Sequence, residues 1–469
     1  MKLLVLLFIH YSLFTIHHSS AAPQPKPNIV LIYADDQGWN DTGYQSDGVF
    51  KTPVLDRMAR EGMVFTDAYT NAANCQPARA CVLSGNYGPR HHVFAVNDTN
   101  RGPKEHMRLK PVPNRDGLAV EDITIADALK AAGYTTGHFG KWHLYNKAGK
   151  ASKGGGGALP SQQGFDVTYD SFGDGELPEG AKGNFPGPKT DPKGVFDLSK
   201  QACKFMEANK DKPFFVYLAH HAPHAPVNSR DSTRKEIKNR YQACVYDLDA
   251  SVDLVLAKIK ELGIANNTLI IYTSDNGGSG SQKPLRGEKG MYYEGGIREP
   301  MIAWWPGVIE AGSSCSAHVM QIDYFPTFLD LAGVEKIEKE LDGESLTPLL
   351  KQSGELKRTS LFWHMPGYLD RPKKGARDEH FRTRPVSAMR KGKWKLHLYH
   401  EEWLLDGGKD KIATNNAVEL YNLEKDIGEK TNLAQQKPEV RDELINELLA
   451  WFEAVNAPMP TKRKSAKKQ

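Results

Sequence analysis

Acidic and amide side chains follow two short apolar runs of the sequence. Asp35 and Asp36 come directly after the first run, and Asp275 and Asn276 follow the second after a single serine. Such runs predict buried strands, and open α/β sheets bind ligands at the carboxyl ends of their strands. Carboxylate and amide oxygens are hard donors that suit Ca²⁺ or Mg²⁺. An Asp after a strand is more often only a turn cap, but two pairs at equivalent positions favour a metal site.

A second chemical motif has the form C-x-P-x-R and runs from Cys75 to Arg79. Pro77 favours the first turn of a helix and Gly85 favours a helix end, so Cys75 is expected at a helix N-terminus. Free backbone N–H groups and the helix dipole stabilise an anionic group at that position. Arg79 lies one turn further on and is expected on the same face. A purely structural role is the alternative for the isolated motif.

The elements that must position these residues alternate along the chain. Apolar, β-branched runs predict strands at 28–34, 214–219, 269–273 and 301–305, and helical patterns occur at 52–60, 125–132, 234–262 and 322–332. This alternation indicates an α/β fold with a sheet between layers of helices. Thr52 and Thr124 are the expected N-caps of the first two helices. The Gly- and Pro-rich stretch at 147–193 is expected to form a long surface excursion.

The character of the sequence changes near Gly343, and 469 residues allow two or three domains. Short alternating stretches and a final helix at 438–455 predict a smaller α+β domain at 344–458, after a catalytic domain at 25–343. The basic end at 459–469 is expected to be disordered.

Taken together, these residues and several further segments resemble the formylglycine-dependent sulfatases of the alkaline phosphatase superfamily. The segments that carry the resemblance are residues 35–38, 75–79, 134–144, 274–277, 284–300 and 419–423. They occur in the order of the family and span essentially the whole chain after its leader. The resemblance implies a large mixed, mostly parallel sheet between helical layers, with a smaller C-terminal α+β domain.

The resemblance also implies a modified residue and a metal. A maturase would oxidise Cys75 to formylglycine (3-oxoalanine), whose hydrated form supplies one hydroxyl that attacks sulfur and a second whose proton loss expels sulfate. Ca²⁺, with Mg²⁺ as the alternative, would be bound by oxygens of five residues: Asp35, Asp36, modified Cys75, Asp275 and Asn276.

Five basic residues complete the implied catalytic set. Arg79 would stabilise the hydrated aldehyde, and Lys141 and Lys289 would bind the sulfate oxygens. His143 would assist recovery of the aldehyde and His224 would protonate the leaving oxygen, although these two proton roles can be exchanged because both imidazoles have ordinary pKa values near neutrality. Read alone, Lys141 is typical of a surface lysine and His224 of a structural histidine.

The substrate expected from this resemblance is a sulfated carbohydrate, such as a galactose or N-acetylgalactosamine sulfate. A polar and aromatic segment suits sugars and their anionic groups: Trp363, His364, Tyr368, Arg371, His380 and Arg382. A phosphatase or phosphonate hydrolase of the same superfamily is the first alternative. A carbohydrate-binding pseudoenzyme, in which Cys75 is never oxidised, is the second.

Composition and the first residues indicate the compartment. Residues 1–22 have a basic start, a short apolar stretch and small residues at the end, so they predict a signal peptide and export to the periplasm or the extracellular space. The net charge of +4 is accounted for by five basic residues of the tail, so no basic stripe for nucleic acid is expected. Mean hydropathy of −0.54 excludes a multi-span membrane protein, and no integral membrane span is expected.

Five cysteines form an odd number for an exported chain. Oxidation of Cys75 would explain it. The other four, Cys81, Cys203, Cys244 and Cys315, allow three full pairings or none.

Overall fold

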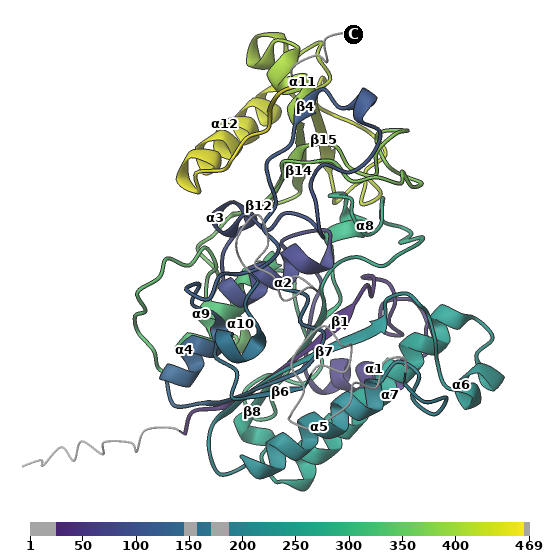
Figure 1. Ribbon diagram of the computed structural model, residues 1–469, viewed down its shortest axis with the longest axis vertical. Helices are drawn as coiled ribbons and strands as arrows, with labels where there is room; N and C mark the ends of the chain where they lie inside the picture. Colours follow the sequence, from purple (N-terminus) through teal and green to yellow (C-terminus); the bar gives the residue numbers. More distant parts are fainter. Residues whose placement is uncertain (1–24, 145–156, 170–186, 464–469) are drawn as a thin grey trace, which may run out of the picture.

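The computed structural model describes residues 25–144, 157–169 and 187–463 (Figure 1). Its larger part is built on an eight-stranded sheet in which β1 (Asn28–Asp35) lies near the centre. The strands in spatial order are β10 (Ser313–Cys315), β2 (Met63–Phe65), β9 (Met301–Trp304), β8 (Thr268–Ser274), β1, β7 (Phe214–Pro223), β5 (Thr135–Gly140) and β6 (Val167–Tyr169). All pairings are parallel except those that β9 makes with β2 and β8, which confirms the predicted mixed, mostly parallel sheet.

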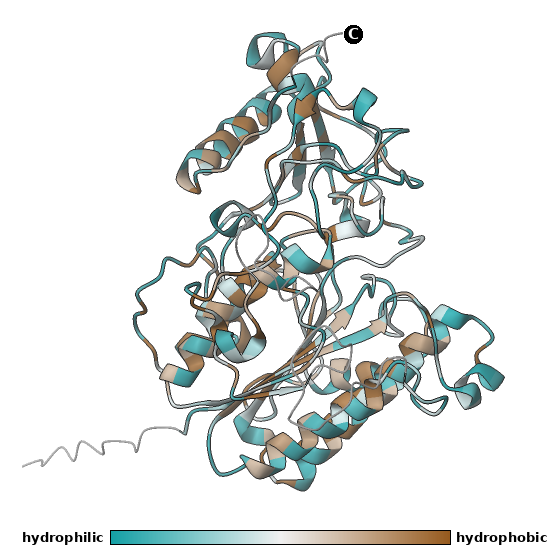
Figure 2. Cartoon of the chain, in the orientation of Figure 1, coloured by the Kyte–Doolittle hydropathy of each residue, from teal (hydrophilic) through white to brown (hydrophobic). Residues whose placement is uncertain are grey.

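Helices cover both faces of this sheet, which explains why its central strands are apolar throughout (Figures 1 and 2). Alternate residues of β1 pack into two separate cores, with Leu31 in one and Ile32 in the other. The first core includes residues of α2 (Cys75–Ser84), α4 (Ile125–Ala131) and α9 (Tyr324–Leu331). The second includes residues of α1 (Pro53–Glu61), α5 (Val195–Ala208) and α7 (Arg240–Glu261).

Two local predictions about these helices need correction. The helix expected at 234–262 is interrupted, giving α6 (Asp231–Glu236) and α7, because the Asn239 side chain accepts hydrogen bonds from the first backbone N–H groups of α7. Thr52 precedes α1 but does not cap it with its side chain. The capping box at Thr124 is present as predicted.

The smaller part contains a four-stranded antiparallel sheet, as the predicted α+β organisation requires. Its strands in order are β12 (Ser360–Met365), β13 (Val386–Lys391), β14 (Trp394–Tyr399) and β15 (Val418–Asn422). The long helix α12 (Pro438–Ala454) packs on this sheet through residues such as Leu444 and Leu448. Figure 1 shows this part above the main sheet, with α11 (His400–Leu405) at its far end.

Several short elements lie outside these two sheets. They are β3 (Ala68–Tyr69) paired with β11 (Val319–Met320), β4 (Leu109–Lys110) paired with β16 (Thr461–Lys462), and the helices α3 (Gly88–His91), α8 (Glu294–Ile297) and α10 (Thr347–Leu350). Five short 3₁₀ helices lie within the described segments, at Lys104–His106, Pro160–Gln163, Ala265–Asn267, Gln321–Asp323 and Gly408–Lys411. The expectation of a disordered tail does not hold for Thr461 and Lys462, because they pair with β4.

Several expectations fall wholly or partly outside the described residues. The leader at 1–22 lies entirely outside the described residues. Much of the stretch at 147–193 also lies outside them, but its strand β6 forms one edge of the main sheet. All five cysteines lie in described segments, and none forms a disulfide. Among the described helices, none combines the length and the apolar character that crossing a bilayer requires.

Candidate active site

The carboxyl ends of β1 and β8 bring the two acidic pairs together, as their strand positions predict. These strands are parallel neighbours in register, with Ala34 opposite Ser274. Asp36 has a left-handed backbone with φ of 65°, and its N–H donates to Asp275 Oδ1 over 3.1 Å. Asn276 Nδ2 donates to Asp36 Oδ1 over 2.7 Å. Backbone strain of this kind at a polar cluster is typical of functional sites.

Two lysines neutralise the carboxylates of β1. Lys141, which directly follows β5, lies 2.6 Å from Asp35 Oδ2, and Lys289 lies 2.6 Å from Asp36 Oδ1. Burial raises the pKa of Asp35, but the charges of Lys141, His224, Arg79 and Lys289 together outweigh this and hold the pKa well below its usual range. Asp275 differs, because burial and the nearby charge of Asp35 raise its pKa to about 7.

Cys75 is the first residue of α2, as its motif predicts, and only 1% of its surface is exposed. Lys289 Nζ donates to its Sγ over 3.1 Å, and Sγ lies 3.7 Å from Asp36 Oδ1. Burial raises the pKa of the Cys75 thiol well above its usual value. The Cys75 side chain therefore lies at the start of α2 and beside both the Lys289 ammonium group and the Asp36 carboxylate.

Arg79 extends from the next turn of α2 into the same cluster. Its fully buried guanidinium donates to Asp275 Oδ2 over 2.8 Å and to the Lys141 carbonyl over 3.0 Å. Its carbon Cζ also lies 5.2 Å from the centre of the Tyr33 ring. These contacts tie α2 to the ends of β1, β5 and β8.

The two predicted histidines differ in their surroundings. His224 follows β7, its side chain is 31% exposed, and its Nε2 lies 3.7 Å from Asp36 Oδ2. Its Nδ1 lies 2.6 Å from the carbonyl of Ala225, which can only accept, so Nδ1 carries a proton and Nε2 faces the site. His143 is partly buried and has a left-handed backbone, and its buried Nδ1 has no hydrogen-bond partner among the described residues.

The oxygen atoms of this cluster fit a hard divalent cation. Asp35 Oδ1 and Asn276 Oδ1 are buried, and within the described chain neither accepts a hydrogen bond. Potential ligand atoms of Asp35, Asp36, Cys75 and His224 all lie within 4.8 Å of one another. His224 is a neighbour that the predicted ligand set did not include. Uncompensated buried oxygens beside carboxylates are what a Ca²⁺ or Mg²⁺ site requires.

Ser279 is a polar neighbour of the site that sequence reasoning missed. Its hydroxyl donates to Asp36 Oδ2 over 3.1 Å, from the loop that follows Asn276. A serine in a glycine-rich loop carries no signal of such a contact, because the residue type suits any turn.

Part of the expected sugar-binding segment is structural instead. Trp363 is 1% exposed and donates to the Thr70 carbonyl, His364 hydrogen-bonds Ser387, and the Tyr368 hydroxyl donates to Glu401. All three side chains are buried. Trp363 packs in the core of the smaller part, and Tyr368 packs in a separate small apolar cluster. Arg371, His380 and Arg382 keep exposed surface.

Comparison with known proteins agrees with this geometry. The profile of the sulfatase family matches residues 27–334, and that of the N-sulphoglucosamine sulphohydrolase C-terminal region matches residues 287–454. The chain belongs to the sulfatase family. It is 33% identical to arylsulfatase A of Homo sapiens, covering 87% of this chain and 83% of that protein. It is 32% identical to N-acetylgalactosamine-6-sulfatase of Mus musculus, covering 81% and 73%.

A solved structure has a similar whole fold. Ps i-CgsB in complex with k-i-k-neocarrahexaose superposes with a TM-score of 0.69 and 27% identity, covering 91% of this chain and 92% of that one. Family membership makes this chain a sulfatase, an enzyme that hydrolyses sulfate esters. Both of its parts fall within the matched regions.

Proposed function

We propose that this sulfatase removes sulfate from sulfated carbohydrates, using a formylglycine made by a maturase from Cys75. The observation that carries the proposal is the position of Cys75, at the start of α2 and in contact with Lys289 beside Asp36. The hydrated aldehyde supplies two hydroxyls at this position, one for attack on sulfur and one for release of sulfate.

The basic side chains of the site have complementary roles in the proposal. Lys289 and Lys141 hold the negative charge of the sulfate oxygens, which intensifies during attack, in a buried setting where such contacts are strong. Arg79 fixes the orientation of Asp275 and of the helix that carries Cys75. His224 presents Nε2 from the exposed side of the site, and in its imidazolium form, with both ring nitrogens protonated, it would give the Nε2 proton to the leaving oxygen.

A divalent cation completes the proposed site. Asp35, Asp36, Asp275 and Asn276 would hold Ca²⁺, or Mg²⁺, together with an oxygen of the modified residue at position 75. When bound, the cation supplies positive charge that acidifies a hydroxyl and stabilises negative oxygens.

The carbohydrate substrate is supported by the relatives. One is an N-acetylgalactosamine-6-sulfatase, and a solved structure of another holds a neocarrahexaose. Galactose and N-acetylgalactosamine sulfates are therefore the proposed substrates. The pattern of residues 1–22 supports export, which would place the enzyme where such polysaccharides are found.

The test is turnover of matched sulfate and phosphate esters by the mature protein. We expect release of sulfate from galactose or N-acetylgalactosamine sulfates, with little release of phosphate from the corresponding phosphates. Cys75→Ala should abolish sulfate release while the far-UV circular dichroism spectrum stays unchanged. Faster turnover of the phosphates would favour a phosphatase or phosphonate hydrolase, and sugar binding without turnover of either ester would favour a pseudoenzyme.

A further inference from the structure

Arg382 lies beside the loop that carries Lys289. Its Nη1 is 3.4 Å from the Lys289 carbonyl oxygen, and Lys289 Nζ contacts Cys75 Sγ. The next residue, Gly290, has φ of +87°, and a Cβ there would come within 2.5 Å of Arg382 Cδ. Glycine at 290 therefore lets the arginine side chain lie across the loop backbone, one residue from a lysine that we place on the sulfate.

Within the described chain, the Arg382 guanidinium has no carboxylate within ion-pair distance. Its two hydrogen bonds, to carbonyls of Lys289 and Arg371, are long at 3.4 and 3.3 Å. Neighbouring arginines differ: Arg384 pairs with Glu401 over 3.1 Å, and Arg377 pairs with Glu419 over 3.2 Å. Glu288 and Asp370 act on Arg382 only from beyond ion-pair distance. A half-buried guanidinium without a direct ion pair is poorly compensated, which favours binding of an anion from outside the chain.

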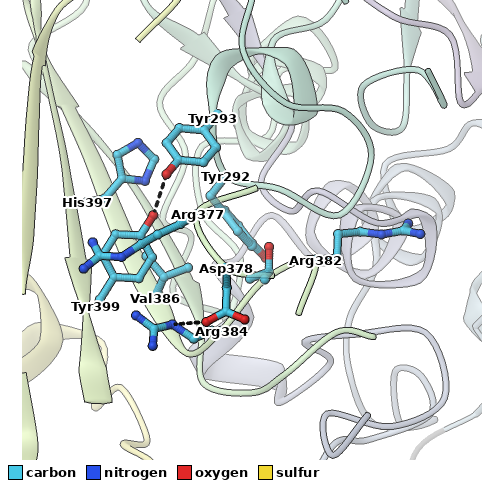
Figure 3. Close-up of a pocket in the computed structure, with 10 residues that line it drawn as sticks. Tyr292, Tyr293, Arg377, Asp378, Arg382, Arg384, Val386, His397 and Tyr399 are labelled. Atoms are coloured by element: carbon cyan, nitrogen blue, oxygen red, sulfur yellow. Dashed lines mark hydrogen bonds and ion pairs between the residues drawn. The ribbon is translucent and has the colours of Figure 1, made fainter. Parts of the chain in front are cut away.

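The arrangement of side chains shows where such an anion would bind. Figure 3 shows Arg382 pointing away from the cluster around Tyr399. The cavity within that cluster has about 20 Å³, enough for about one water and far too small for a sugar. The Arg382 guanidinium instead lies against the Lys289 loop, where its Nη1 contacts the Lys289 carbonyl.

The charges around Arg382 also favour an anion. Arg371 is exposed, with 82% of its side chain accessible, and makes only a 3.7 Å contact to Asp370. That carboxylate is already paired with Arg101 over 2.6 Å. A second acid that acts on Arg382, Glu288, is paired with Lys373 over 3.4 Å. Positive charge exceeds negative charge along this edge.

We propose that Arg382 binds a second anionic group of the substrate, next to the sulfate ester that is hydrolysed. The substrate class would then be glycans that carry several anionic groups, rather than singly sulfated sugars. A second sulfate and a uronic acid carboxylate share the paired oxygens that a guanidinium binds in bidentate fashion. This inference rests on the proposed function and adds a specificity residue to it.

The test compares kcat/KM for three probes in wild-type and variant enzymes. They are N-acetylgalactosamine 6-sulfate, N-acetylgalactosamine 4,6-disulfate, and N-acetylgalactosamine 6-sulfate linked to glucuronic acid. We expect wild type to prefer one of the two probes with a second anion, and which one identifies the group. Arg382→Gln should lower that preference about 10-fold or more, and Arg382→Lys should restore it only in part, because lysine keeps the charge without the planar fork.

Lys210→Gln is the matched control, because it removes one exposed positive charge after α5 and should leave the preference unchanged. The inference would be overturned if wild type and Arg382→Gln both hydrolyse the singly sulfated probe and show the same preference for probes with a second anion. The proposed function would still stand in that case. Hydrolysis of none of the probes would count against the proposed function. Calorimetric titration of each of the two probes with a second anion into Cys75→Ala and Cys75→Ala/Arg382→Gln then decides the inference directly, since equal affinities of the two variants for both probes would overturn it.

Discussion

His224 and His143 occupy different positions around the same cluster, and this difference supports the proposed division of their roles. His224 is partly exposed and fixed by the Ala225 carbonyl, so its Nε2 faces the space from which a leaving group departs. His143 lies deeper, and burial together with the charge of Lys141 keeps its pKa well below the usual value. The pKa of His224 is lowered too, but the charges of Asp35 and Asp36 oppose the effect of burial there. The His224 imidazole is therefore the more easily protonated of the two, as a general acid requires.

His224→Gln should therefore slow the release of poor leaving groups most. For a sugar sulfate we expect kcat to fall about 10²- to 10⁴-fold, which is the usual range for loss of a general acid. For 4-nitrophenyl sulfate the loss should be much smaller, because nitrophenolate leaves without a proton. Steady-state kinetics on the two substrates measures the difference. If His143→Gln instead slowed the sugar sulfate much more than 4-nitrophenyl sulfate, and His224→Gln slowed both substrates equally, the two histidines would have the opposite roles.

At the scale of elements, α1 is held at its start by a distant residue. Asp249, in the middle of α7, accepts hydrogen bonds from the backbone N–H groups of Val54 and Leu55 over 3.1 and 2.8 Å. It therefore performs the capping that the sequence assigned to Thr52, whose hydroxyl donates to Asp56 instead. Burial of Asp249 raises its pKa to about 7, against an ordinary value of 3.8.

This raised pKa predicts how stability depends on pH. The folded protein binds the Asp249 proton more tightly than the unfolded chain, so this contribution is complete below pH 3.8 and is lost as pH rises through about 7. Asp249→Asn removes the titration. Between pH 5 and 6 the stability of wild type should thus fall relative to the variant by up to about 1.4 kcal/mol per pH unit. Urea unfolding across this range measures it, and parallel pH profiles for the two proteins would refute the explanation.

The same elements show what could be predicted from sequence. The strand before Asp35, the helix after Cys75 and the capping box at Thr124 rest on local patterns, and all three are present. The cap from Asp249 could not be predicted, because it depends on packing between distant segments. From the sequence alone, Trp363 could stack on a sugar or pack in the core, and only the folded sheet shows that its ring is buried.

At the scale of the whole molecule, buried charges connect the two parts close to the active site. Glu294 begins α8, five residues after Lys289, and its carboxylate accepts from Lys395 Nζ of β14 over 2.7 Å. Both side chains are fully buried. The Glu294 N–H also donates to Glu429 over 2.7 Å. The smaller part thus supports the loop that carries Lys289, so it contributes to the site as well as covering it.

Lys395→Met tests this connection, because it leaves the Glu294 carboxylate buried without its main partner. We expect the free energy of unfolding to fall by about 3–5 kcal/mol, as for other broken buried pairs. Lys391→Met is the matched control on the neighbouring strand, where a partly exposed lysine pairs with Glu443 and Glu447. That change should cost less than about 1 kcal/mol. Equal losses in urea unfolding would show that the buried pair has no special role.

The most direct test of the whole account is mass spectrometry of the peptide that contains Cys75, from active protein made in its own host. If the account is right, residue 75 has lost its sulfur and two hydrogens and gained one oxygen, as formylglycine requires. The fraction of modified peptide should also rise in proportion to specific sulfatase activity across preparations. Full activity in protein whose residue 75 is entirely unmodified cysteine would contradict the account.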